Sequence, residues 1–535
     1  MRGIRRAASA LPSFTMETAT QQVPPSAHAP TYARGTLCAI AGVLDSLAEA
    51  RVAYCAWKSN QHLDAALAGE TDLDLLVDRA DAASLAEALA RHGLKRLLPP
   101  ADMGHPATEH FLGFDRASGS LFHLHVQYQL VLGQKYIKNY TIPLERQFLE
   151  SAEPLHGVPV PRAELELAIL AARALLKYRP RDVVKDVLRI RSPGVPAETR
   201  AEITWLEART TLDEVRRTLD ACGDVLPSGP ICAFLARLDA APRSGFAFLR
   251  LRAQLRRELV RFRRRRPTAA LLAYLQAGWR RRRHLRIRPT DLRMTPQSGG
   301  MTIAFVGADG SGKSTTAETM ADWLGWKLQS NVHYMGSKSP TRRSRLLYLS
   351  FRVFRRAHRA TARRLGQDAL PARPMAEARD VLHALHHLSI GRDRACRYQQ
   401  ALAEARAGRV VIFDRFPLAC VSKGPDDRLL DGPQIASALG PPPGRLARRL
   451  APSEERLYEQ FRLPDHLIVL TVEPDVAVAR KPDHDREVLR RKCRAVVGLA
   501  ARAESRGDVD VARIDANRSA EAVLSDVKVE VWDAL

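Results

Sequence analysis

The sequence has little cysteine, and no two of its cysteines form a C-x-x-C pair. The 535 residues include seven cysteines, an odd number, scattered along the chain. This pattern argues against a disulfide framework and against a structural zinc site, because both need paired or closely spaced thiols. A reducing compartment suits such a chain, and we therefore expect a cytoplasmic protein.

Long apolar runs are also missing. The chain has no unbroken apolar stretch of the length that crosses a bilayer, so it predicts no membrane-spanning helix. Residues 1–35 carry basic side chains without a sustained apolar core, which is not the pattern of a signal peptide. We expect a disordered leader here, in which Met16 is an alternative start to Met1.

Acidic residues are scarce in two stretches that carry almost all of the net charge. The formal net charge is +24, and residues 249–288 hold fifteen arginines against one acid, Glu258. Residues 342–364 hold nine arginines and no acid. The rest of the chain is therefore nearly neutral, so the charge belongs to two segments and not to the protein as a whole.

Leucine and phenylalanine alternate with arginine in these segments, as in 246–266 and 345–356. Such a stretch can be an ordinary helix that packs its apolar face inward and leaves its arginines solvated. It can also lie on an anionic membrane surface or bind nucleic-acid phosphates. No recognised nucleic-acid-binding module accompanies the arginines, so nucleic acid is the least favoured partner.

A glycine-rich loop carries the clearest chemistry. Residues 307–315 are GADGSGKST, between an apolar run at 302–306 and a helical pattern that begins at Lys313. This is the strand–loop–helix setting of the phosphate-binding P-loop. Its backbone N–H groups and the helix N-terminus favour a polyphosphate. The predicted nucleotide-binding residues are Gly307, Gly310, Ser311, Gly312, Lys313, Ser314 and Thr315.

Composition and periodicity divide the chain into five segments. Candidate helices at 37–50 and 80–92 and candidate strands at 72–77 and 121–127 give an α/β pattern early in the chain. A long helical region follows, and then a stretch rich in proline, glycine and serine. We predict a disordered leader (1–35), a small α/β domain (36–160), a helical, Arg-rich middle region (161–287), a linker (288–300) and a P-loop α/β domain (301–535).

The last segment alternates strands with helices, which predicts a parallel sheet with helices on both faces. Asp414 and Arg415 directly follow a buried strand, where a ligand crevice is expected. The carboxylate suits Mg²⁺ or its waters and the guanidinium suits a phosphate, although a strand-end ion pair would give the same pattern. The candidate strands are 302–306, 331–335, 409–413, 466–472 and 511–514.

Residues 301–535 resemble the thymidylate kinase family of nucleoside monophosphate kinases. Asp309 occupies the acidic position of that family's P-loop, and Asp414-Arg415-Phe416 matches its Asp-Arg-Tyr motif. Arg394, twenty residues before the motif, matches the family's acceptor-binding arginine. The basic lid of the family corresponds to Arg480, Lys481 and Arg486, and its adenine-side loop to residues 511–523.

The resemblance implies transfer of a phosphoryl group from ATP, with Mg²⁺ as cofactor. In such a reaction the protein has to position the reactants and neutralise the charge on the phosphate oxygens. The implied metal ligands are Ser314 and Asp414. The implied catalytic residues are Lys313, Asp309, Arg415, Arg394 and Arg486.

Two parts of this segment depart from the family. Thymidylate-phosphorylating members continue the Asp-Arg-Tyr motif with a Ser-x-x-Ala-Tyr-Gln-like stretch, whereas this chain has PLACVSKGPDDRLLDGP at 417–433. A long Arg-rich insertion at 340–375 replaces a short acceptor-side segment. The resemblance therefore implies phosphoryl transfer but not ordinary dTMP as acceptor.

The early α/β segment resembles the polymerase-β type of nucleotidyltransferase fold over about 45–130. Asp72 and Asp74 lie two apart, so on a strand they face the same side and can bind divalent cations. Lys58 lies in the region that meets the triphosphate in that family. A third carboxylate is missing, and His123 and His125 stand in its place as ligands or as structural histidines. A solvated strand end is the competing interpretation of the two aspartates.

The sequence thus predicts an ATP- and Mg²⁺-dependent phosphotransferase fused to a nucleotidyltransferase-like domain. If the arginine-rich helices bind lipid, its place is the cytoplasmic surface of an anionic membrane. The competing class is an ATP-binding regulatory or scaffold protein with degenerate active sites.

Overall fold

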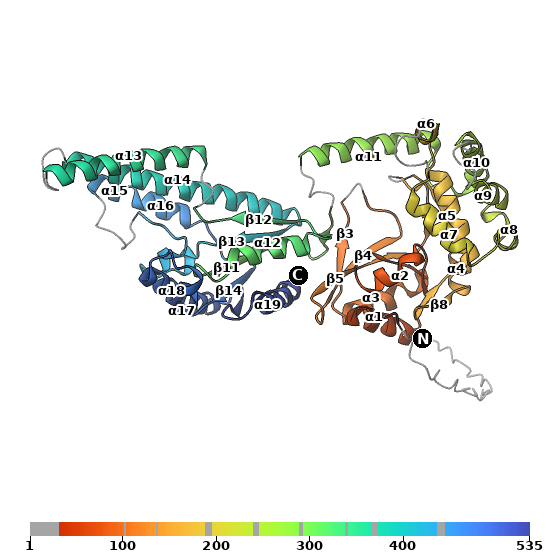
Figure 1. Ribbon diagram of the computed structural model, residues 1–535, viewed down its shortest axis with the longest axis horizontal. Coiled ribbons are helices and arrows are strands. Elements are labelled where there is room, and N and C mark those ends of the chain that lie inside the picture. The colour runs from red at the N-terminus through yellow and green to blue at the C-terminus, as the bar shows by residue number, and fades with distance from the viewer. Residues whose placement is uncertain are drawn as a thin grey trace, which may run out of the picture.

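The computed structural model shows two α/β halves in contact, each extended by helices (Figure 1). The predicted leader up to residue 31, with Met1 and Met16, and residues 288–292 of the predicted linker lie outside the described residues. The structure describes residues 32–100, 103–134, 137–187, 195–238, 245–287, 293–337, 341–365, 372–435 and 444–535.

The N-terminal half contains a six-stranded sheet in the order β1-β2-β5-β4-β3-β10. The β2–β5 pair is parallel, and the other neighbours are antiparallel. β2 and β5 confirm the strands predicted at 72–77 and 121–127, whereas the sequence analysis did not predict β3 and β4. The strands are β1 (Tyr54–Ala56), β2 (Leu73–Val77), β3 (Lys95–Leu98), β4 (Thr108–Asp115), β5 (Ser120–Gln127) and β10 (Thr295–Pro296).

Two amphipathic helices cover this sheet and confirm the helices predicted at 37–50 and 80–92. In α1 (Cys38–Glu49) the buried residues recur at helical spacing, as at Ile40, Val43, Leu44 and Leu47. α3 (Ala82–Arg91) buries Leu85, Ala88 and Leu89 in the same way. The smaller elements of this half are α2 (Leu63–Leu67), β6 (Leu130–Leu132), β7 (Tyr140–Ile142), α4 (Glu145–Glu150), β8 (Glu153–Leu155) and β9 (Val158–Val160).

The middle of the chain is helical, as predicted for the region from 162 onward. α5 (Ala163–Lys177) is its centre and is buried on most sides, which explains its nearly continuous apolar sequence. A capping box of Thr211 and Glu214 begins α8. The other helices are α6 (Pro180–Val187), α7 (Ala197–Glu207), α8 (Leu212–Ala221), α9 (Ser228–Leu235), α10 (Gly245–Glu258) and α11 (Pro267–Ile287).

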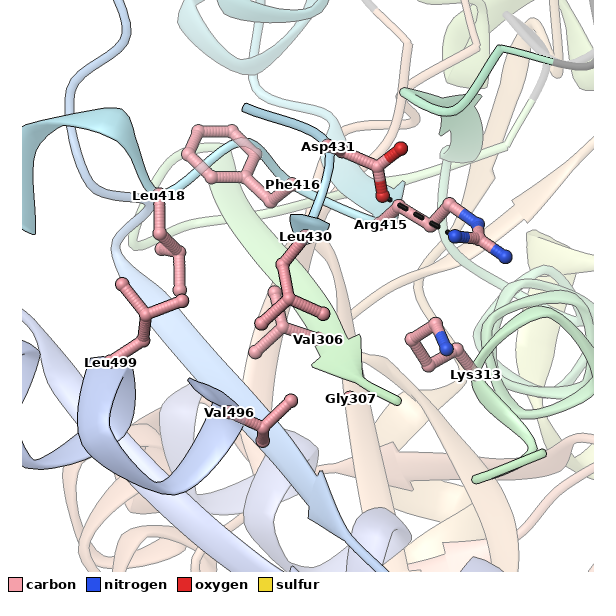
Figure 2. Close-up of a pocket in the computed structure, with 10 residues that line it drawn as sticks. All are labelled: Val306, Gly307, Lys313, Arg415, Phe416, Leu418, Leu430, Asp431, Val496 and Leu499. Carbon is pink, nitrogen blue, oxygen red and sulfur yellow. Dashed lines mark hydrogen bonds and ion pairs between the residues drawn. The ribbon is translucent and has the colours of Figure 1, made fainter. Parts of the chain in front are cut away.

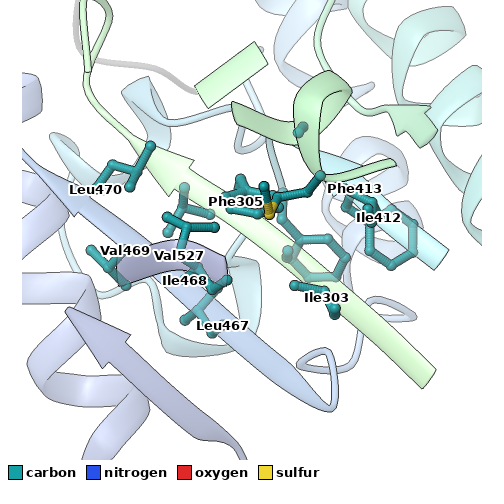
Figure 3. Packing of buried hydrophobic residues seen from close by; sticks show 14 of the residues in the cluster. Ile303, Phe305, Ile412, Phe413, Leu467, Ile468, Val469, Leu470 and Val527 are labelled. Atoms are coloured by element: carbon teal, nitrogen blue, oxygen red, sulfur yellow. The ribbon is translucent and has the colours of Figure 1, made fainter. Parts of the chain in front are cut away.

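The C-terminal half contains a five-stranded parallel sheet in the order β12-β13-β11-β14-β15, with helices on both faces. Its core packs β11, β13 and β14 against helices, and Figure 3 shows Phe305 and Ile468 beside Val527 of α19. All five predicted strands of this half are confirmed. They are β11 (Met301–Gly307), β12 (Ser330–Tyr334), β13 (Val410–Asp414), β14 (His466–Thr471) and β15 (Asp510–Asp515).

The long helices of this half include a hairpin that extends from the sheet (Figure 1). α13 packs along α14, whose later turns reach the strands. The Arg-rich insertion predicted at 340–375 thus forms α13 and the first residues of α14, with residues 366–371 outside the described residues. The helices are α12 (Lys313–Leu324), α13 (Arg342–Leu365), α14 (Ala372–Arg406), α15 (Arg445–Arg448), α16 (Ala451–Tyr458), α17 (Pro474–Arg480), α18 (Arg486–Glu504) and α19 (Ala520–Ala534).

The two halves share one apolar core. Leu97, Leu112 and Phe114 of the N-terminal sheet belong to the same buried cluster as the P-loop sheet. Phe114 contacts the rings of Trp323 and Trp532 at centroid distances of 5.4 and 5.7 Å. The predicted linker contributes β10, which pairs with β3 and so adds an edge strand to the N-terminal sheet.

Within the part of the chain that the structure describes, no helix is both long and apolar enough to cross a membrane. All seven cysteines are free thiols.

Candidate nucleotide site and acceptor cavity

The P-loop joins β11 to α12 at the centre of the parallel sheet. Gly310 and Gly312 have φ angles of +91° and +89°, in the left-handed region that favours glycine. At Gly307 a Cβ would lie 2.5 Å from the Ser311 hydroxyl and 2.6 Å from the carbonyl of Leu470. The three glycines are therefore required by backbone geometry, which confirms the loop structure that the motif predicts.

Lys313 is the first residue of α12 and is buried, with 5% of its surface exposed. Its Nζ donates to the carbonyl oxygen of Ala308 at 2.6 Å, so the ammonium lies over the loop. Burial, and then the neighbouring charge of Arg415, lower the pKa of Lys313 to about 8. A buried cation over a glycine-rich loop at a helix N-terminus is a favourable position for phosphate oxygens.

Two buried polar atoms beside the loop lack hydrogen-bond partners among the described residues. They are Oδ1 of Asp414, at the end of β13, and Oγ of Ser311. Asp414 is 5% exposed, and β13 pairs with β11 so that Asp414 faces Phe305 in register. Ser314 is exposed on the first turn of α12. A carboxylate with a spare oxygen and an exposed hydroxyl are groups that suit Mg²⁺, which favours few protein oxygens and several waters.

Asp309 of the loop is bound by two cations. Its Oδ1 accepts from Arg415 Nη2 at 2.8 Å, and its Oδ2 accepts from Lys492 Nζ at 2.6 Å. Burial opposes its charge, but the bond to Lys492 and the charges of Lys313 and Arg415 together hold the pKa of this carboxyl below its usual value. Lys492 on α18 was not singled out by the sequence analysis, because nothing in a run of basic residues marks which one turns inward.

Arg394 and Arg415 converge on a residue that the sequence analysis also missed, Asp431. Arg394 Nη2 donates to Asp431 Oδ1 at 2.9 Å, and Arg415 Nη1 donates to Asp431 Oδ2 at 3.4 Å. Asp431 lies in the stretch 417–433 that departs from the family. Its only local signal is the Asp-Gly-Pro sequence, which is typical of a turn.

Arg394 is buried, and its donors are used within the protein. Nε donates to the carbonyl of Met335 at 2.6 Å, and Nη1 donates to the carbonyl of Asp431 at 2.8 Å and to the hydroxyl of Tyr458 at 2.5 Å. Burial opposes its charge, but Tyr458 and Asp431 raise its pKa above the usual value. The binding of an acceptor phosphate by this residue stays a prediction, while its observed bonds position Asp431.

A small cavity lies between this charged group and an apolar wall. Figure 2 shows Lys313, Arg415 and Asp431 on one side of it, and apolar side chains on the other. It opens at the carboxyl end of β11, where a ligand crevice is expected in a parallel sheet. The apolar wall is formed by Val306, Phe416, Leu418, Leu430, Val496 and Leu499.

The predicted lid residues lie on the other side of the loop. Arg480 Nη1 donates to the carbonyl of Ala516 at 2.8 Å and to that of Gly310 at 3.3 Å, so it connects the P-loop to the adenine-side loop. Lys481 and Arg486 are exposed. The catalytic role given to Arg486 stays a prediction, and its exposed position at the start of α18 leaves it able to meet a bound phosphate.

In the N-terminal half, Asp72 and Asp74 border a second cavity but are already paired with cations. Asp74 Oδ1 accepts from Lys58 Nζ at 2.6 Å and lies 2.5 Å from Nδ1 of His125. Asp72 Oδ1 accepts from Lys327 Nζ at 2.5 Å and lies 3.0 Å from Nδ1 of His123. Asp72 precedes β2 instead of lying on it, because the strand begins at Leu73.

The cation partners of Asp72 and Asp74 weaken the case for the predicted metal site. Within the described ranges, no group of three or more histidine, cysteine, aspartate or glutamate side chains is arranged to hold a metal ion. His123 and His125 stack with His110 and approach the two aspartates, so they act as partners of the carboxylates in this structure. Metal binding by Asp72 and Asp74 stays a prediction without support from a third ligand.

Comparisons with known proteins give one clear relationship. No protein-family model matches the chain. It is 30% identical over 192 residues to the uncharacterized ATP-binding protein YghR of Escherichia coli strain K12, covering 36% of this chain and 72% of YghR. It is 30% identical over 194 residues to the uncharacterized ATP-binding protein YghS of the same strain, covering 36% of this chain and 77% of YghS.

Solved structures match more distantly. Deoxyadenosine kinase from M. mycoides with bound dATP aligns over 43% of this chain and 98% of its own, with 14% identity and a TM-score of 0.27. The same enzyme with bound dCTP aligns over 44% of this chain and 100% of its own, with 13% identity and a TM-score of 0.28.

Proposed function

This chain belongs to the family of ATP-binding proteins that includes YghR and YghS, and from this premise we propose that it is an ATP- and Mg²⁺-dependent phosphotransferase of kinase type. The observation that carries the proposal is the buried Lys313 over the glycine loop, with Arg415 and Asp414 directly beside it. A protein that only held ATP would need the loop. It would not need a second cluster of charged side chains, at Arg415 and Asp431, next to the loop.

In the proposed reaction the protein supplies position and charge. Lys313 and the loop N–H groups hold the phosphates, and Ser314 and Asp414 are the residues that would hold Mg²⁺. When bound, Mg²⁺ would neutralise charge on the phosphate oxygens. Arg415, fixed by Asp309, faces the place where the transferred group would carry its charge.

The proposal is tested by ATP turnover in the full-length protein. We expect Lys313→Ala to lower phosphoryl transfer by at least about a hundredfold, because it removes a charge stabilisation specific to the phosphates. Lys423→Ala is the matched control, since that side chain is exposed and outside the cavity. Circular dichroism and thermal unfolding establish that both variants are folded. Equal turnover in the Lys313 variant and the wild type would contradict the assignment.

The competing proposal is a regulatory or scaffold protein that binds ATP without transferring it. It predicts tight ATP binding with no acceptor-dependent loss of the γ-phosphoryl group. The charged cluster of Asp309, Arg415 and Asp431 beside the loop favours the kinase, because ATP binding alone does not require it. We do not extend the proposal to nucleotidyl transfer, since Lys58 and Lys327 occupy the two N-terminal carboxylates.

A further inference from the structure

We propose that the acceptor site binds a hydroxyl group on Asp431, in place of a phosphate group on Arg394 and Arg415. This inference rests on the proposed kinase function and names the substrate class for it. The starting observation is that Asp431 already supplies the anion that both arginines would otherwise take from a monophosphate. An acceptor with a phosphate at this position would have to displace a built-in carboxylate.

Asp431 is held in place at two points, so it is a fixed part of the site. Arg394 donates to its backbone carbonyl and to its carboxylate at the same time. Its backbone is left-handed, with φ of +62°, a conformation that a non-glycine residue keeps only when its surroundings enforce it. Arg415, its other partner, also has a positive φ, of +69°. A carboxylate fixed in this way is poorly suited to swing aside for a phosphate.

The local charges lead to the same conclusion. Four cations meet at the site, Lys313, Arg394, Arg415 and Lys492, and three carboxylates offset them. These carboxylates are Asp309, Asp414 and Asp431. ATP alone brings several further negative charges, so the site needs no anionic acceptor to reach balance. A neutral hydroxyl fits this charge distribution better than a second phosphate.

The carboxylate has capacity for one more hydrogen bond, and it faces the cavity. The contact from Arg415 to Oδ2 is 3.4 Å, longer than the 2.9 Å bond at Oδ1, so Oδ2 can accept from a hydroxyl as well. Across the cavity stand Phe416, Leu418 and Leu499. The acceptor we infer is an uncharged alcohol, either a nucleoside, a sugar or a lipid alcohol, with an apolar part next to its reactive hydroxyl.

In the proposed step the acceptor oxygen forms a bond to the γ-phosphorus while the bond from that phosphorus to the β–γ bridging oxygen breaks. ADP leaves with that oxygen. The hydroxyl proton passes to the Asp431 carboxylate and from there to water. Arg415 forms ion pairs with both Asp431 and Asp309, so its guanidinium lies where it can stabilise the negative charge of the phosphoryl group during transfer.

The test compares acceptor classes with the full-length protein and labelled ATP. Nucleosides, sugars and an isoprenoid alcohol form one panel, and the matching monophosphates form the other. We expect transfer to a member of the first panel, with kcat lower by on the order of a hundredfold in Asp431→Asn and KM for ATP unchanged. Asp426→Asn is the matched control, because Asp426 lies in the same stretch but pairs with Arg491 outside the cavity.

Three other outcomes separate the claims. Transfer confined to monophosphates contradicts the hydroxyl inference and leaves the kinase proposal standing. A gain in monophosphate use in Asp431→Ala, with no loss of alcohol use, also contradicts it, since Asp431 would then be a mere occupant of a phosphate site. If the wild type binds ATP and transfers to neither panel, the kinase proposal fails and this inference fails with it.

A different observation carries a second inference, about the surface of the molecule. We infer that α11 and α13 together form a docking face for an anionic membrane surface. Both helices lie along the same edge of the molecule, at the top of Figure 1. α13 holds the nine arginines of 342–364, and α11 holds five of the fifteen in 249–288, so this edge gathers part of the excess positive charge.

Each helix exposes an apolar stripe with arginines beside it. On α13, Leu346, Leu349 and Val353 follow helical spacing and are 66, 50 and 63% exposed. On α11, Leu271 and Leu275 are 60 and 57% exposed. The ordinary interpretation of these stretches requires an apolar face turned inward. It holds for 246–266, where Phe248, Leu255 and Leu259 are buried, but not for these exposed side chains of α11 and α13. Exposed leucines flanked by arginines match the interface of an anionic bilayer.

The test is co-sedimentation of the full-length protein with phosphatidylcholine vesicles, with and without phosphatidylglycerol, at physiological salt. We expect binding only to the anionic vesicles, and about tenfold weaker binding when Leu346, Leu349 and Val353 are replaced by serine. Serine at Leu446 and Val497, which are similarly exposed on α15 and α18, is the control. Failure to bind anionic vesicles, or binding to DNA that persists where vesicle binding does not, would overturn the inference.

Discussion

Lys327 donates its Nζ to the carboxylate of Asp72 at 2.5 Å, and this bond joins the two halves of the molecule. Lys327 lies three residues after the last residue of α12, Leu324, and that helix begins with Lys313 over the P-loop. The nucleotide site and the N-terminal carboxylates are therefore connected by a single helix of about 18 Å.

We predict that the Lys327–Asp72 pair contributes measurably to stability. Lys327→Met and Asp72→Asn should each lower the free energy of unfolding, and the double variant should lose less than the sum. Because Asp72 is about one-third exposed, we expect a coupling energy of only about 0.5–1 kcal/mol. Urea unfolding of the four proteins measures it. Strict additivity would mean that the bond contributes nothing in solution.

The aromatic contact between the halves should matter more. Trp532 is 4% exposed and lies against Phe114. Trp532→Ala should therefore cost about 3–5 kcal/mol, which is typical of a large aromatic removed from a core. We expect the N-terminal and C-terminal halves, followed by fluorescence and by ATP binding, to unfold together in the wild type and at different urea concentrations in this variant. Coincident transitions in the variant would show that the contact does not couple the halves.

Glu166 gives a prediction about pH. It is buried in α5, accepts from the side chain of Asn60 at 2.8 Å, and burial raises its pKa to about 7. The folded protein therefore binds a proton that the unfolded chain releases near pH 4.5, so stability should fall as pH rises from about 4.5 to 7. The shift corresponds to at most about 3 kcal/mol.

Glu166→Gln tests this prediction because it removes the titrating group and keeps the shape. The variant should lose the decline in urea midpoint between pH 5 and pH 8 that the wild type shows, and at pH 8 it should be the more stable protein. Glu150→Gln is the control, since that side chain is exposed on α4. An unchanged pH slope in the Glu166 variant would mean that Glu166 is ionised in the folded state across this range.

Gly307 tests the geometry of the loop without touching its charges. A methyl group there would meet the Ser311 hydroxyl and the Leu470 carbonyl at about the distances given above, and the carbonyl belongs to a neighbouring strand that cannot give way. Gly307→Ala should therefore abolish ATP binding, as measured by titration calorimetry. Gly278→Ala, on α11 and in open space, should bind ATP like the wild type.

The sequence predicted the parts of the fold that local patterns determine. The P-loop strand, the acidic end of β13 and the five parallel strands follow from apolar runs between helical patterns, and all were placed correctly. β3 was missed because it is half exposed and has no clear apolar alternation. Asp431 and Lys492 were missed for another reason. Asp431 acts as the partner of Arg394 and Lys492 as the partner of Asp309, and only the tertiary structure brings these pairs together.

The pairing of β10 with β3 determines where this chain can be divided. Residues 288–300 have the composition of a linker, so a cut within or just before them is an obvious way to separate the halves. Such a cut leaves the edge of β3 without its partner, and an uncovered strand edge invites pairing with other molecules. It would also uncover Phe114 and Leu97 on one product and Trp532 on the other. We therefore expect the two pieces to aggregate when made separately and to remain soluble when produced together. The two apparent modules would then be one folding unit.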